Sequence, residues 1–139
     1  MSFPVSIKGV LLDSDRVALL ENERGEWELP GGRLQTGEPP VVCLMREFAE
    51  ELGIEVAADH ILDCWVYEIL PQRRVVIVTY AVRRLDHGAL RISAEHRRCG
   101  WFARIGASSD ARRLSSLDPR LSRAGWLVDV EPKIAGWVI

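Results

Sequence analysis

Residues 31–54 of the chain read GGRLQTGEPPVVCLMREFAEELGI, and this stretch predicts the helix around which the rest of the fold is organised. Successive residues of a helix turn by roughly 100°, so residues three and four positions apart share a face. Glu47, Glu50 and Glu51 would therefore project from one side of this helix. Five apolar residues are expected on the opposite, buried side: Val41, Met45, Phe48, Ala49 and Leu52.

Both ends of the predicted helix carry sequence signals. Pro39 and Pro40 suit a first helical turn, whose N–H groups have no acceptor within the helix. Glu38 stands where a capping acid or a first-turn acid is favoured. Gly53 can adopt the left-handed conformation with which many helices end. We therefore predict a helix from about Pro39 to Leu52.

Three carboxylates on one helix face need a physical reason, because each like-charged pair weakens a helix by a few tenths of a kcal/mol. A divalent cation would reverse that effect, since oxygen ligands suit Mg²⁺, which keeps several waters and shares its coordination shell with phosphates. The alternative is a solvated face, because the pattern E-x-x-E-E is also common on surface helices. The triplet by itself leaves both interpretations open.

The residues that flank the triplet decide between these interpretations. They follow the spacing G-x5-E-x7-R-E-U-x-E-E-x-G-U, in which U is a bulky apolar residue. The matching residues are Gly32, Glu38, Arg46, Glu47, Phe48, Glu50, Glu51, Gly53 and Ile54. This pattern resembles the Nudix hydrolase box, with Phe48 a less usual choice for U. Every fixed position is present, so the resemblance is specific for the family, although it says little about the substrate.

The resemblance implies a fold and a reaction. The implied fold is of the α/β (α+β) class, a Nudix α/β/α sandwich in which a curved mixed sheet lies between helices. The implied reaction is the hydrolysis of the diphosphate linkage in a nucleoside diphosphate joined to another group, with Mg²⁺ or alternatively Mn²⁺ as cofactor. Candidate substrates are a (d)NTP, oxidised or not, and a nucleotide sugar such as ADP-ribose. A non-catalytic, nucleotide-sensing domain is the alternative, but such domains usually lose glutamates of the box.

The resemblance also implies which residues bind the metal. Glu47, Glu50 and Glu51 would be ligands, and the backbone carbonyl of Gly31 would join them. Either Glu50 or Glu51 would in addition orient or deprotonate the attacking water.

The resemblance also implies supporting roles for residues other than the metal ligands. Arg46 would hold a glutamate of the helix through its guanidinium fork, whereas Glu38 would buttress the loop and the helix start. Some members of the family use a further glutamate from a late loop, and Glu95 in the stretch ISAEHRRCGWF is the candidate. An exposed loop acid is the alternative for Glu95. His96 is expected to be a solvated loop histidine.

Outside the box, apolar and β-branched runs alternate with turn residues. Strands are expected over residues 6–13, 16–21, 26–29, 61–70 and 75–85, with a further short strand beginning at residue 100. Residues 75–85 are expected to form a central strand, and residues 61–70 to bend near Asp63. Apolar spacing over residues 114–130 predicts a second helix. This order of elements favours a mixed sheet with helices.

Composition limits the remaining function classes. The 139 residues suit a single domain over 1–139, and 47% hydrophobic residues supply a core. A net charge of −2 argues against a stable nucleic-acid complex, and no apolar run reaches the roughly 20 residues of a membrane span. Three scattered cysteines suggest reduced thiols in the cytoplasm. The expected partner is a small nucleotide, and the apolar tail at 134–139 is compatible with a last strand or a homodimer interface.

Overall fold

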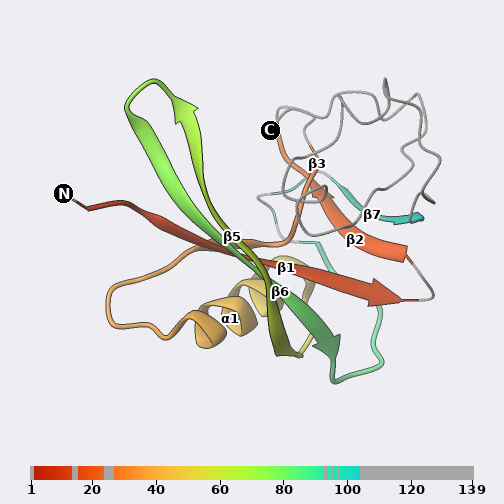
Figure 1. The fold of residues 1–139 in the computed structure, drawn as a ribbon. Helices are drawn as coiled ribbons and strands as arrows, with labels where there is room; N and C mark the ends of the chain where they lie inside the picture. Colours follow the sequence, from red (N-terminus) through yellow and green to blue (C-terminus); the bar gives the residue numbers. More distant parts are fainter. Residues whose placement is uncertain are drawn as a thin grey trace.

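The computed structural model describes residues 2–13, 16–23, 27–92, 94, 96 and 98–103. Within these residues one helix packs against a single seven-stranded sheet (Figure 1). The elements are β1 (Val5–Asp13), β2 (Arg16–Glu21), β3 (Trp27–Glu28), β4 (Gly31–Arg33), α1 (Pro40–Leu52), β5 (Val56–Leu70), β6 (Arg73–Arg84) and β7 (Arg98–Ala103). The helix predicted over 114–130, the apolar tail at 134–139 and Glu95 lie outside the described residues.

The sheet is mixed, as the sequence predicted. Its order is β3-β2-β1-β6-β5, while β4 pairs with β1 and β7 pairs with β2. The β1 and β6 strands run parallel, with Val5 opposite Val76 and Leu11 opposite Val82, and the other pairs are antiparallel. The β6 strand lies between β1 and β5, which confirms the prediction of a central strand. In the described part of the chain, no helix combines the length and the apolar character that crossing a membrane requires.

The largest differences from the predicted strands concern β5 and β4. The β5 strand begins at Val56 and not at Ile61, because its backbone continues to pair with β6 through two register shifts, one of which falls at the predicted bend near Asp63. The Gly31–Gly32 pair lies beyond the strand predicted over 26–29 and, with Arg33, forms a separate strand, β4, that was not predicted. Gly31 lies opposite Lys8 in antiparallel register with β1, so the glycines belong to the sheet.

Both ends of the helix lie close to the predicted positions. It begins at Pro40 and is followed by Gly53, whose left-handed φ of 66° lets its N–H donate to the carbonyl of Ala49. The expected role of Glu38 as a cap is not observed, because Pro39 occupies the N-cap position and no side chain caps the helix.

The predicted buried face of α1 was partly wrong. Phe48 and Leu52 are fully buried, but Val41 and Met45 are 40% and 38% exposed, and Ala49 is also exposed. The residues that are buried in their place are Cys43, Leu44 and Glu51. Relative to the predicted orientation, the helix is therefore rotated about its axis, so that Glu51 turns toward the sheet. This rotation brings the carboxylates to the boundary between helix and sheet.

Candidate functional site

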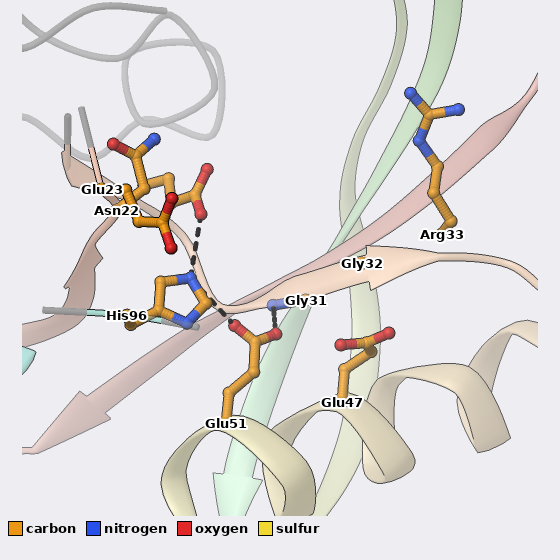
Figure 2. A pocket seen from close by; sticks show the side chains of 9 residues that line it. Asn22, Glu23, Gly31, Gly32, Arg33, Glu47, Glu51 and His96 are labelled. Atoms are coloured by element: carbon orange, nitrogen blue, oxygen red, sulfur yellow. Dashed lines mark hydrogen bonds and ion pairs between the residues drawn. The ribbon is translucent and has the colours of Figure 1, made fainter. Parts of the chain in front are cut away.

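A pocket of about 530 Å³ opens between the helix and β4 (Figure 2). Its lining includes acids, a glycine pair, one imidazole and one arginine, all within the described residues. They are Asn22, Glu23, Glu28, Gly31, Gly32, Arg33, Glu47, Glu51 and His96. We call this the acid pocket. It brings together three of the predicted site residues, namely Gly31, Glu47 and Glu51.

Glu51 is the most buried acid of the pocket, with 3% of its surface exposed. Its Oε1 accepts a hydrogen bond of 3.0 Å from the N–H of Gly31, and its Oε2 lies 3.6 Å from Nε2 of His96. Burial raises the pKa of Glu51 to about 8, and the nearby Glu47 carboxylate adds to this increase. The charge of Lys8 and the Gly31 hydrogen bond partly oppose it. Glu51 therefore stands in an environment that favours a bound proton or a bound cation.

The glycine pair lets backbone and carboxylates approach closely. Gly31 has a φ of 138°, and a Cβ added there would lie 2.0 Å from the carbonyl oxygen of Ile7. A Cβ added at Gly32 would lie 2.4 Å from Oε1 of Glu47. Any larger residue would therefore press on β1 at the first position and would displace a carboxylate at the second.

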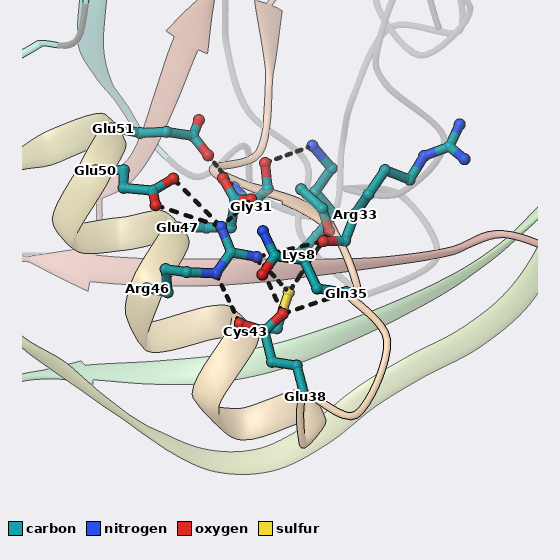
Figure 3. Close-up of polar contacts among 11 residues, drawn as sticks. Lys8, Gly31, Arg33, Gln35, Glu38, Cys43, Arg46, Glu47, Glu50 and Glu51 are labelled. Atoms are coloured by element: carbon teal, nitrogen blue, oxygen red, sulfur yellow. Dashed lines mark hydrogen bonds and ion pairs between the residues drawn. The ribbon is translucent and has the colours of Figure 1, made fainter.

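Arg46 links three acids of the box (Figure 3). Its guanidinium binds both carboxylate oxygens of Glu38, at 2.6 and 3.0 Å, and it reaches Oε1 of Glu47 at 3.0 Å. It also lies 3.3 Å from Oε2 of Glu50. The hydrogen bonds from Arg46 hold the pKa of Glu38 well below its usual value, at about 2. Arg46 therefore ties the start of the helix and the preceding loop to the acidic face.

The acids are of the kind that binds a hard divalent cation, although their carboxylates do not all point to one place in this structure. Among the described residues, no three acidic, imidazole or thiol side chains are close enough to hold a metal ion. Glu47 and Glu51 face the pocket, whereas Glu50 is 58% exposed and pairs with Arg46. The absence of a side chain at Gly32 keeps the space beside Glu47 open. Carboxylate oxygens beside an open space are the donors that Mg²⁺ and Mn²⁺ take, so the residues present fit such an ion.

Two residues of this region were not found from the sequence. His96 was expected to be solvated, but its side chain is only 8% exposed and its Nε2 lies 3.1 Å from Oε1 of Glu28. The prediction was wrong because His96 closely precedes β7, which pairs with β2 beside β3 and so places the ring at the pocket. Lys8 is buried in β1 and donates to backbone carbonyls beside the pocket. Its signal was a lone charge within an apolar strand.

Comparison with known protein sequences places the box in a family. The model of the NUDIX domain matches residues 3–118. A Mycobacterium tuberculosis (strain CDC 1551 / Oshkosh) protein named "Putative 8-oxo-dGTP diphosphatase 2" is 32% identical over 112 residues, which are 81% of this chain and 73% of that protein. The 8-oxo-dGTP diphosphatase of Proteus vulgaris is 38% identical over 58 residues, which are 42% of this chain and 51% of that protein.

Solved structures show the same architecture. The MutT NUDIX hydrolase from Burkholderia pseudomallei superposes with a TM-score of 0.64 at 26% identity, covering 74% of this chain and 84% of that chain. A UDP-X diphosphatase superposes with a TM-score of 0.68 at 19% identity, covering 74% of this chain and 52% of that chain. The mixed sheet, the helix with its complete box and the family match agree with one another, and the chain therefore belongs to the NUDIX family of pyrophosphate-cleaving hydrolases.

Proposed function

We propose that this chain hydrolyses the diphosphate linkage of a nucleoside triphosphate, oxidised or not, with Mg²⁺ or Mn²⁺ bound at the acid pocket. The observation that carries the proposal is that buried Glu51 and Glu47 line the same pocket beside the backbone of Gly31 and Gly32. Relatives named 8-oxo-dGTP diphosphatase support the triphosphate class. Nucleotide sugars such as ADP-ribose are the second class to be tested.

Each residue has a proposed role. Glu47, Glu50, Glu51 and the carbonyl of Gly31 would hold the cation, and for Glu50 this requires its side chain to leave Arg46. A bound divalent ion neutralises phosphate charge and lowers the pKa of water. Glu51 or Glu50 would orient the attacking water or accept its proton. Glu95 stays a prediction as an additional loop acid.

We expect hydrolysis to depend strictly on the cation. Purified protein incubated with dGTP, 8-oxo-dGTP, ADP-ribose and a UDP-sugar should release product in Mg²⁺ or Mn²⁺ and none in EDTA. Without the cation, the carboxylates of the acidic face cannot neutralise the negative charge of the phosphates. Product release is measured by chromatography, and restoring Mg²⁺ after EDTA serves as the control. A protein that binds nucleotides by calorimetry but cleaves none of them would instead support the non-catalytic, sensing alternative.

Arg46→Lys should lower kcat about tenfold. Lysine keeps the positive charge but loses the planar fork that binds both oxygens of Glu38 and reaches Glu47. Glu47 would then be less well oriented, so the Mg²⁺ concentration for half-maximal rate should also rise. Steady-state kinetics over a Mg²⁺ series measures both effects.

Arg74→Lys is the matched control for this substitution. Arg74 lies 3.9 Å from Glu68, and both side chains are about half exposed, so its kinetics should equal those of the wild type. Equal kinetics for Arg46→Lys and the wild type would contradict the positioning role of Arg46.

A further inference from the structure

Lys8 is unusual because it is a charged residue inside the sheet. It lies in β1 within the run IKGVLL and is only 8% exposed. Its neighbours Ile7 and Leu11 pack in the core with Phe48 of the helix. Burying an ammonium is costly unless hydrogen bonds or opposite charges compensate it. The contacts of Lys8 therefore indicate what it contributes.

The ammonium of Lys8 binds backbone at the rim of the acid pocket (Figure 3). Its Nζ donates to the carbonyls of Leu29 and Gly31, each at 3.3 Å. The N–H of Gly9 donates to the carbonyl between them, that of Pro30, at 3.0 Å. Two adjacent residues of β1 therefore bind three successive carbonyls, which fixes the backbone that leads into β4.

This backbone carries a group that contacts the buried acid. Gly31 donates its N–H to Glu51 at 3.0 Å while its carbonyl accepts from Lys8. Gly31 is thus held at both of its backbone groups, once from the helix and once from β1. The positive charge of Lys8 also lies close enough to act on the carboxylate of Glu51. Lys8 is therefore coupled to Glu51 both through the backbone and through its charge.

We infer that Lys8 is a positioning residue of the acid pocket, which holds Gly31 against Glu51 and supplies a fixed positive charge when no cation is bound. The inference rests on the proposed function, because it takes Gly31 and Glu51 as groups that meet the cation. Lys8 lies outside the box and contacts no reacting group itself. With Mg²⁺ bound, the charge of Lys8 would matter less, so Lys8 would moderate the gain in stability on cation binding.

The test compares Lys8→Met, which keeps the length but removes charge and donors, with Lys8→Arg, which keeps both. Thr79→Val is the matched control, because Thr79 is the β6 neighbour of Lys8, is fully buried, and has no hydrogen-bond partner for its hydroxyl in the described structure. Thermal melts are recorded in EDTA and in saturating Mg²⁺, and steady-state kinetics are measured well below the melting temperatures.

Lys8→Met should melt lower than the wild type in EDTA and should show a larger rise in Tm on adding Mg²⁺. Its kcat should fall about 10-fold to 100-fold with little change in KM, because Gly31 and Glu51 lose their relative placement. Lys8→Arg should recover most of kcat, and Thr79→Val should match the wild type. If Lys8→Met does not fold, Lys8→Gln carries the same comparison of Tm in EDTA and Mg²⁺.

A purely structural role gives a different result. The inference is overturned if Lys8→Met lowers Tm equally in EDTA and Mg²⁺ and keeps kcat within about twofold of the wild type, since a positioning residue costs more than that. A wild type without any Mg²⁺-induced rise in Tm and without hydrolysis would overturn the proposed function, and this inference with it. Measurements on the wild type alone therefore tell whether the proposed function fails or only the inference about Lys8.

Discussion

Glu51→Gln is expected to lower kcat by roughly 10²- to 10⁴-fold at saturating Mg²⁺, the range typical for loss of an acid–base group. Glutamine has the size of glutamate and keeps an oxygen that can accept the Gly31 N–H, so the local backbone should persist. It cannot accept a proton, and it is a weaker ligand for a hard cation. The effect should therefore fall on kcat and on the Mg²⁺ requirement, and the melting temperature in EDTA should not decrease.

Single-turnover and steady-state kinetics over a Mg²⁺ series measure this effect. Glu68→Gln is the control, because Glu68 is about half exposed on the β5–β6 hairpin, where it lies 3.9 Å from Arg74 and accepts a hydrogen bond of 3.3 Å from the N–H of Gln72. Glutamine keeps an acceptor oxygen for that N–H, so the rate of this variant should equal that of the wild type. A Glu51→Gln enzyme that retains a kcat within about tenfold of the wild type would show that Glu51 is not the main acid of the site.

The same variant has a consequence for stability without metal. The carboxyl of Glu51 has an ordinary pKa of 4.5, and burial raises it to about 8 in the folded protein. Between these values the folded state holds a proton that the unfolded state has released, so the free energy of unfolding falls as pH rises from about 4.5 to 8. Denaturant unfolding in EDTA should show this decline in the wild type, and it should be weaker in Glu51→Gln.

Local signals in the sequence predicted most of the elements. Proline at the start and Gly53 at the end set the helix, because both act through their own backbone conformation. The strands at residues 5–13 and 16–21 follow from short apolar runs. The rotation of the helix about its axis was not predicted. Periodicity shows that a face is apolar, but only the contact with β4 explains why Glu51 is buried in place of Val41 and Met45.

The residues added by the structure depend on contacts between distant parts of the chain. His96 meets Glu28 because β7 and β3 both pair with β2. Lys8 meets Leu29 and Gly31 because β4 pairs with β1. Neither contact follows from a spacing in the sequence, since strand pairing and register are decided by the whole sheet. The box could therefore be read from the sequence, whereas His96 and Lys8, which lie outside the box, could not.

Gly31→Ala should destabilise the fold by about 4 kcal/mol or more, at the upper end of single substitutions. Its φ of 138° is strained for any residue with a side chain, and the added Cβ would lie 2.0 Å from the carbonyl oxygen of Ile7 and 2.8 Å from Cα of Lys8. These are backbone atoms of β1 that cannot rotate away. The pairing of β4 with β1 would open, and the Gly31 N–H would leave Glu51. Denaturant unfolding measures the loss.

Substitutions at two other glycines distinguish the cost of a strained backbone from the cost of a steric clash. Gly37 also has a positive φ, 77°, but a Cβ there would meet nothing within 4 Å, so Gly37→Ala should cost only about 1–2 kcal/mol and leave activity intact. Gly32→Ala would press on the movable carboxylate of Glu47 at 2.4 Å. It should fold but bind Mg²⁺ more weakly, because the side chain can yield where β1 cannot. If Gly31→Ala lowered the free energy of unfolding no more than Gly37→Ala does, the result would contradict the claim that close packing of Gly31 on β1 holds the glycine pair beside the acids.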